Sequence, residues 1–89
     1  MTYENVRAAK ERLERRYLHT DPWNTYVNGI GIGKVGTNDP DAPAEEHDNF
    51  CIVILLRKKL PPELELPAEE SGIRIISWVV GEVRPYGSN

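Results

Sequence analysis

The sequence predicts an α+β fold in which one N-terminal amphipathic helix packs on a small, mainly antiparallel sheet of three strands. Three observations support this class: an apolar stripe with helical spacing near the start of the chain, an alternating glycine-rich segment, and two later apolar segments of strand length. The chain has 89 residues, so we expect a single domain over residues 1–89 with a modest core.

Residues 3–18 are predicted to form the helix. Apolar side chains recur there every three or four positions: Val6, Ala9, Leu13 and Tyr17. This spacing places them along one side of a helix, while most other positions are charged. Thr2 is suited to cap the N-terminus, and Pro22 disfavours helical backbone at the residue before it.

The first two predicted strands differ in character. In residues 26–36, Ile30 and Ile32 point to one face, and the glycines between them leave the other face bare for a close approach by a helix or an aromatic ring. Residues 50–59 begin with seven consecutive apolar side chains, which indicates a central strand that is buried on both faces.

The third predicted strand, residues 73–83, is apolar on both faces as well. One face carries Ile73, Ile75, Val79 and Val83, and the other carries Ile76, Trp78 and Val80. Between the first two strands, residues 37–49 contain two prolines, five acids and no large apolar residue, so we expect a mobile acidic loop. Residues 60–72 form a proline-bounded connection whose leucines can tuck against the sheet.

A single helix covers only one face of this sheet, and the second face would then be an apolar patch of the size that marks an interface. A homo-oligomer, most simply a twofold dimer, would bury it. The alternative is that residues 37–49 and the leucines of residues 60–66 cover it within the chain. The residues that we expect at the interface are Ile76, Trp78, Val80 and Trp23.

The charge of the chain limits its partners. A formal net charge of −3 and an isoelectric point near 5.3 disfavour nucleic acid, which needs a basic surface. Basic side chains nevertheless occur near the ends of the predicted strands, and they give an alternative function: binding of a small anion, such as a nucleotide, at a subunit interface. The residues for that site are Lys34, Arg57, Lys58 and Arg84.

No catalytic residue, metal site or cofactor is predicted. Residues 31–36 match G-x-G-x-x-G, but an acidic, proline-containing segment follows where a phosphate site needs a helix. The acids of residues 37–49 lack the spacing of a calcium loop. His19 and Asp21 would need a nucleophile such as Ser71 or Ser77, and nothing in the sequence places either serine beside them.

The chain is expected to be cytoplasmic. Its first residues lack the apolar core of a signal peptide, and the longest apolar run, residues 50–56, is too short to span a bilayer. The lone cysteine, Cys51, lies in that run and is expected to be a small buried apolar side chain.

Residues 26–83 resemble a known type of sequence. The features that carry the resemblance are Asn28-Gly-Ile-Gly-Ile-Gly, the strand that ends in basic residues, Leu60-Pro, a proline-bounded spacer and Gly72-Ile before a valine-rich strand. This pattern resembles the region that precedes the protease domain in some bacterial trypsin-like and plant narrow-leaf-type proteins, and small stand-alone bacterial proteins whose function is not known. The resemblance implies a non-catalytic accessory module.

From these observations we expect a non-catalytic module that binds another protein or itself. An enzyme is the third possibility, after the binder of a small anion.

Overall fold

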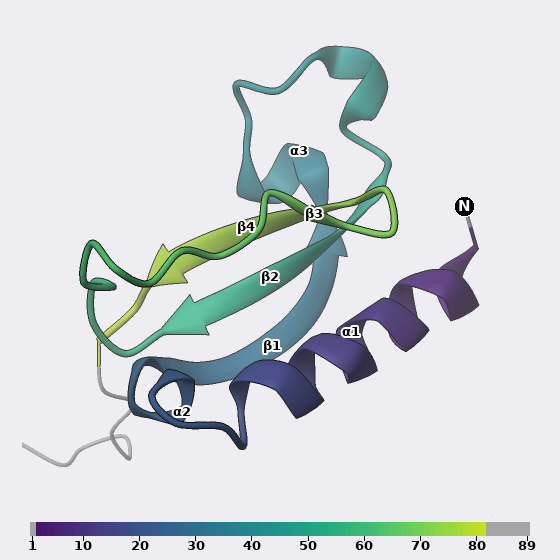
Figure 1. Ribbon diagram of the computed structural model, residues 1–89. Helices are drawn as coiled ribbons and strands as arrows, with labels where there is room; N and C mark the ends of the chain where they lie inside the picture. Colours follow the sequence, from purple (N-terminus) through teal and green to yellow (C-terminus); the bar gives the residue numbers. More distant parts are fainter. Residues whose placement is uncertain (1, 82–89) are drawn as a thin grey trace, which may run out of the picture.

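The structure is a computed structural model that describes residues 2–81, and it confirms an α+β fold with an N-terminal helix packed on a sheet (Figure 1). The helix is α1 (Tyr3–Tyr17), and the strands are β1 (Val27–Lys34), β2 (Phe50–Leu56), β3 (Glu69–Glu70) and β4 (Ile73–Val79). Three short turns of helix complete the order: α2 (Trp23–Tyr26), α3 (Val35–Asn38) and the 3-10 turn η1 (Ala44–Glu46).

The sheet has four strands in the order β1-β2-β4-β3, and this corrects the prediction of three mainly antiparallel strands. β1 and β2 are antiparallel as expected, but β4 is parallel to β2, with Cys51 beside Arg74 and Leu56 beside Val79. The physical reason is the length of residues 57–72, which return the chain along the sheet before β4 begins. A parallel pair needs such a long connection.

The unpredicted strand, β3, forms a tight hairpin with β4. Glu70 pairs with Ile73, so only Ser71 and Gly72 lie in the turn. Both have positive φ, 53° and 80°, which is the geometry of a two-residue hairpin turn. The Ser-Gly pair was therefore the sequence signal for this strand.

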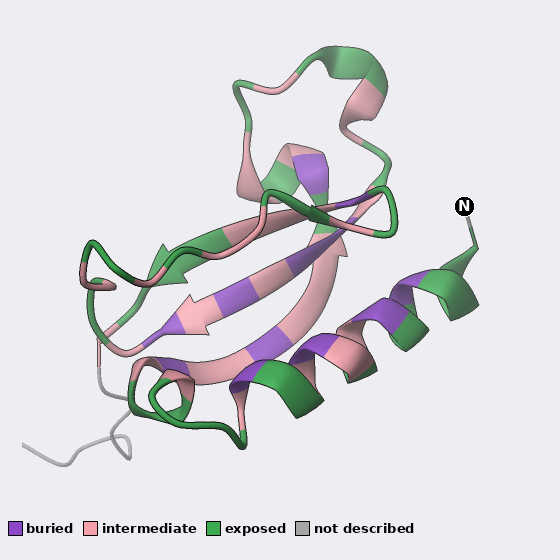
Figure 2. Ribbon diagram, viewed as in Figure 1, coloured by how far each residue is buried: buried purple, intermediate pink, exposed green. Residues whose placement is uncertain are grey.

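The predicted apolar stripe of α1 is confirmed. Val6, Ala9 and Leu13 are fully buried, and Thr2 caps the helix by accepting a hydrogen bond from the backbone N–H of Asn5. The stripe packs on β1 and β2, so the buried residues gather between α1 and the sheet (Figure 2). Their partners from the strands are Val27, Ile30, Ile52, Ile54, Leu56 and Ile73.

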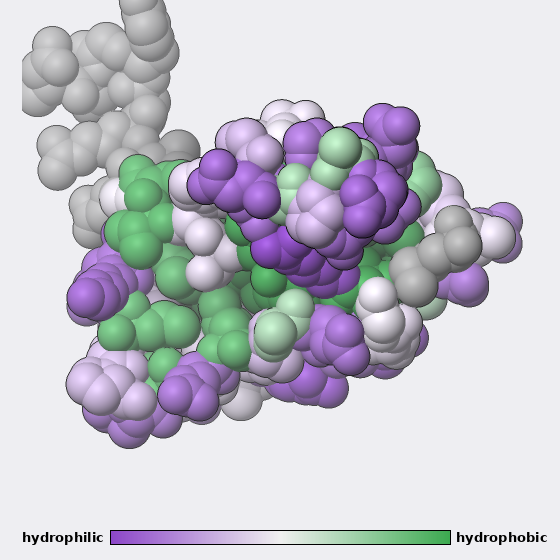
Figure 3. All heavy atoms as spheres, turned by 90° about the horizontal axis from the view of Figure 1, so that it is seen from above, coloured by the Kyte–Doolittle hydropathy of each residue, from purple (hydrophilic) through white to green (hydrophobic). Residues whose placement is uncertain are grey.

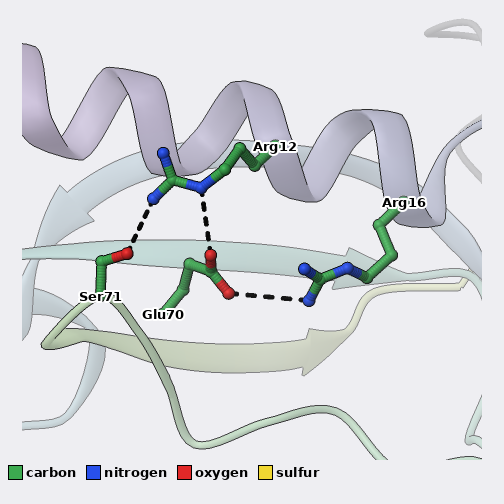
Figure 4. A network of polar contacts seen from close by, with 4 residues as sticks. All are labelled: Arg12, Arg16, Glu70 and Ser71. Atoms are coloured by element: carbon green, nitrogen blue, oxygen red, sulfur yellow. Dashed lines mark hydrogen bonds and ion pairs between the residues drawn. The ribbon is translucent and has the colours of Figure 1, made fainter.

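A polar network fastens the β3–β4 hairpin to α1 (Figure 4). The guanidinium of Arg12 donates to the Glu70 carboxylate at 3.1 Å and to the Ser71 hydroxyl at 2.8 Å. Arg16 makes an ion pair with the same carboxylate at 3.6 Å. Arg16 is exposed and Arg12 is partly exposed, so solvent screening keeps the energetic contribution small, and the network serves mainly to orient the hairpin.

The acidic segment 37–49 lies between the antiparallel strands β1 and β2, as predicted, and it contains short turns of helix. These are the end of α3 and all of η1, and the Gly36 N–H, just before the segment, donates to the His47 carbonyl at 3.0 Å. The His47 ring also donates a hydrogen bond from Nε2 to the Ala42 carbonyl, 2.7 Å away. Asp39 makes an ion pair with Arg74 of β4.

The strands are shorter than predicted at their ends. β1 and β2 end at Lys34 and Leu56, because the chain turns into α3 in one case and into the connection in the other. β4 ends at Val79, and the predicted positions 82 and 83 lie outside the described residues. Within residues 2–81, no helix combines the length and apolar character needed to cross a membrane.

Candidate functional site

The candidate site is the face of the sheet that α1 does not cover. Residues that pair across neighbouring strands share a face, so the register places Gly31, Val53 and Ile76 together. We call this surface the open face and define it by its residues: Gly29, Gly31, Val53, Leu55, Ile76, Trp78 and Val80. The prediction that Ile76, Trp78 and Val80 share a face of β4 agrees with this register.

The open face is apolar and largely accessible. Trp78 and Val80 are 45% and 49% exposed, and Val53, Leu55 and Ile76 are half-buried. Figure 3 views the molecule from the side of α3 and shows hydrophobic surface next to the polar segment 37–49. Contiguous apolar surface of this kind marks a binding site more often than it marks a solvated surface.

Two glycines leave part of the open face bare. A Cβ atom added to Gly29 or Gly31 would meet no atom within 4 Å, and neither residue has positive φ. The fold of the single chain therefore requires glycine at neither position. Glycine weakens a strand because it loses more conformational freedom on folding and offers no side chain to pack.

Within residues 2–81, the chain covers only one end of this side of the sheet. Asn38 of α3 lies over Gly33, where an added Cβ would come within 2.6 Å of the Asn38 amide nitrogen. The side-chain oxygen of Asn38 accepts a hydrogen bond from the Trp78 indole N–H at 3.3 Å. Segment 37–49 therefore gives only part of the predicted cover. Leu60 and Leu66, the leucines that could have added to it, pack against the core between α1 and the sheet.

Trp23 is not part of the open face, and the structure does not bring it together with Trp78. It begins α2 and packs edge-on against Tyr17 of α1, with ring centroids 4.6 Å apart. It is half-buried at the margin of the core. The physical reason is that α2 directly follows the turn after α1, which keeps Trp23 on the helix side of the sheet.

Within one chain, the residues predicted to hold an anion at a subunit interface do not come together. Lys34 pairs with Phe50 at one end of β2, whereas Arg57 follows Leu56 at the other end. The seven residues of β2 separate the two by about 20 Å. Arg84 lies outside the described residues.

The basic side chains of that prediction already have partners within the chain. The Lys34 ammonium donates to the Asp48 carbonyl at 2.8 Å, and the Arg57 guanidinium donates to the Asn28 side-chain oxygen at 3.0 Å. Lys58 lies over the Tyr26 ring, 5.1 Å from its centroid. Each contact fixes local structure, and none directs these cations toward a shared ligand.

Two hollows lie elsewhere on the described surface. The larger, about 380 Å³, lies between segment 46–50 and the start of β4, and Glu46, Asp48 and Arg74 contribute its charged groups. The smaller, about 300 Å³, lies between α1 and the β3–β4 turn beside Arg12. Among residues 2–81, no three His, Cys, Asp or Glu side chains are grouped to hold a metal ion.

The structure does not bring His19 and Asp21 together with Ser71 or Ser77 as a catalytic site. His19 and Asp21 are exposed in the turn after α1. The Ser71 hydroxyl accepts from Arg12 in the network of Figure 4, and Ser77 lies in the middle of β4.

Cys51 is fully buried beneath Asn38, as the sequence predicted. Burial raises the pKa of its thiol, because the thiolate would lose its hydration, and the Gly33 backbone, Arg74 and Asn38 oppose this effect. The thiol therefore stays protonated in the folded protein, which is the opposite of what an activated nucleophile needs.

The raised pKa of Cys51 has a consequence for stability. The folded thiol holds its proton more tightly than the unfolded thiol, so stability is fully present below the unfolded pKa and falls as the pH rises above it. We expect unfolding in urea to show a steeper alkaline loss of stability for the native chain than for Cys51→Ala. Equal alkaline slopes would contradict this; the variant's lower stability at neutral pH does not affect the comparison.

Comparisons with known proteins place the chain in no family. No family model, no curated protein and no solved structure matches it significantly. The resemblance to protease-associated regions stays a prediction.

Val53 and Leu55 of β2 belong to the open face, although they were not among the residues predicted for the interface. Their strand was predicted to be buried on both faces, and they are only half-buried. The signal that could have found them is their position: they alternate with Ile52 and Ile54, which lie on the helix side and are fully buried.

Proposed function

We propose that this chain is a non-catalytic protein-interaction domain whose contact surface is the open face. The observation that carries the proposal is the pair of glycines, Gly29 and Gly31, which leave open space that the described part of the chain does not fill. A backbone exposed in this way allows a partner to approach the sheet closely.

Trp78 has the properties of an anchor for such a partner. Its ring is large, and tryptophan is one of the residues that dominate interface energies. Its indole N–H is held by the Asn38 oxygen, and the Asn38 amide in turn donates to the Lys34 carbonyl at 2.9 Å. A side chain that is already held in place loses less conformational entropy when a partner covers it.

The half-buried aliphatic residues of the open face extend the apolar surface away from Trp78. Val53 and Ile76 lie side by side in the parallel pair, and Leu55 lies beside Trp78. The acidic segment 37–49 borders this surface and supplies a polar rim (Figure 3). An apolar centre with a polar rim is the usual anatomy of a protein–protein interface.

Tryptophan fluorescence tests whether the open face is available. The chain has two tryptophans, so Trp23→Phe leaves Trp78 as the only one. In dilute solution, we expect the emission of Trp78 to be that of a hydrated indole, with efficient quenching by acrylamide. The matched control, Trp78→Phe, leaves Trp23, whose emission should be blue-shifted because the ring packs on Tyr17.

The decisive outcome is the state of Trp78 in the dilute chain. Blue-shifted emission and protection from acrylamide, unchanged on further dilution, would mean that the chain covers its own open face, and the proposal would fail. A hydrated Trp78 supports it.

A further inference from the structure

We propose that the free edge of β4 pairs antiparallel with the same edge of a second copy of this chain, so that two four-stranded sheets become continuous. This surface is the backbone edge at residues 77–80, and it goes beyond the open face, with which it shares only Trp78 and Val80. The occupant is therefore defined: a second copy, related by a twofold axis.

The free hydrogen-bonding groups of β4 can be identified from its bonded ones. The Val80 N–H donates to the Leu56 carbonyl at 2.9 Å, so even-numbered residues of β4 direct their backbone groups toward β2. Odd-numbered residues point the other way, and the Ile75 N–H donates to the Ala68 carbonyl at 2.9 Å. Beyond Ile75, the outward groups belong to Ser77 and Val79.

In the described residues, the segment that pairs with this edge, β3 with Ala68 before it, does not reach the outward groups of Ser77 and Val79. β3 pairs only with Ile73 and Arg74. In residues 2–81, Ser77 and Val79 have no backbone partner on the outer side of β4, and all four residues from 77 to 80 are exposed. Figure 2 shows the exposed end of β4 next to its half-buried middle.

The edge also lacks the features that keep sheet edges apart. Natural edge strands carry charged side chains, proline or a bulge that discourage pairing. From Ile75 to Val80 there is neither charge nor proline, and the register of β4 with β2 is unbroken. The opposite edge, β1, has a bulge between Val27 and Gly29 and ends in Lys34.

The register of the proposed pair follows from the outward groups. Ser77 exchanges hydrogen bonds with the partner's Val79, and Val79 exchanges them with the partner's Ser77. Trp78 then lies on the twofold axis opposite the partner's Trp78, in a pair without backbone hydrogen bonds, where side chains approach most closely. Aromatic pairs at such positions stabilise a sheet.

Charge supports a second copy as the occupant. Lys59 follows β2 at the end of the edge near Val80, and Glu69 lies at its other end, in β3 beside Arg74. Both side chains are exposed. Because a twofold axis through Trp78 reverses the edge, the end of each copy that carries Lys59 faces the end of the partner that carries Glu69.

Up to Gly81, the path of the chain also leaves room for this arrangement. Gly81 has φ of 73° and departs from the line of β4, and its carbonyl accepts a hydrogen bond from the Asn28 side chain at 2.9 Å. Position 81 is thus directed toward β1, away from the outer edge.

Proline at position 79 tests the pairing directly. The Val79 N–H points outward, so Val79→Pro removes a donor to the partner and leaves the bond from Val80 to Leu56 in place. By light scattering across a concentration series, we expect the native chain to dimerise and Val79→Pro to weaken dimerisation by at least about tenfold. The matched control, Val79→Ala, keeps the N–H and should stay within about threefold of the native dissociation constant.

A charge reversal tests the same geometry without changing the backbone. Lys59→Glu and Glu69→Lys should each weaken the dimer, and the double variant should restore it, because the ends of the edge that face each other would again carry opposite charges. Restoration would support the proposal even if Val79→Pro did not fold.

Three results would overturn the pairing. The first is a native chain that stays monomeric throughout the concentration series. The second is dimerisation equally strong in Val79→Pro and Val79→Ala. The third is a charge reversal without restoration. A dimer that resists Val79→Pro but is weakened by Gly31→Val would place self-association on the open face, which supports the proposed function and rejects the edge.

Discussion

Ile54→Ala should lower the free energy of unfolding by about 2–5 kcal/mol, the range for large-to-small changes in a core. Ile54 is fully buried on the helix side of β2, among residues that α1 covers. Truncation leaves a cavity that the neighbouring strands cannot close, since β2 is held between β1 and β4. Urea unfolding followed by circular dichroism measures the loss.

The next residue provides the matched control. Leu55 has the same number of side-chain carbons, lies in the same strand and points to the open face, where it is half-buried. Leu55→Ala should therefore cost only about 1 kcal/mol in the isolated chain, because less surface is exposed on truncation. Similar losses at Ile54 and Leu55 would mean that both faces of β2 are covered within one chain, which contradicts the open face.

Gly31→Val should have opposite effects on stability and on binding. An added side chain at Gly31 meets no atom within 4 Å, and valine suits a strand, so we expect a gain of about 0.5–1 kcal/mol in the free energy of unfolding. The same methyl groups occupy space that we assign to a partner, so any complex on the open face should weaken by at least about tenfold. Unfolding in urea and titration with the partner measure the two effects separately.

Gly33→Val is the control for this substitution. Its Cβ would lie 2.6 Å from the Asn38 amide nitrogen, so the α3 cover must shift and stability should fall. A loss of stability at Gly31 comparable to that at Gly33 would show that the chain fills the space above Gly31, and the proposed function would lose its main support.

Local periodicity predicted the helix and the faces of the strands well. The spacing of Val6, Ala9 and Leu13 predicted the buried side of α1, and alternation within each strand separated Ile30 from Gly31 and Trp78 from Ile75. These features depend on neighbours in the sequence. The parallel pairing of β2 with β4 depends on the path of residues 57–72, which no local pattern reveals, and the prediction of a mainly antiparallel sheet failed there.

The residues of the candidate site were likewise grouped well within one strand and poorly between different elements. Residues on one strand, such as Ile76 and Trp78, were grouped correctly because alternation relates them. Trp23 and Trp78 were grouped by residue type, and Lys34 and Arg57 by charge, and the structure separates both pairs. Side-chain chemistry alone does not place residues that belong to different elements.

The parallel pair also governs the order in which the sheet can be completed during synthesis. α1, β1 and β2 are all made by residue 56, but one flank of β2 has no neighbour until residues 73–79 leave the ribosome. While more than twenty further residues are added, the backbone hydrogen-bonding groups on one edge of β2, the most apolar strand, therefore have no partner strand. A chaperone that binds extended apolar segments would find its site in this interval, and it would lose that site as soon as β4 docks.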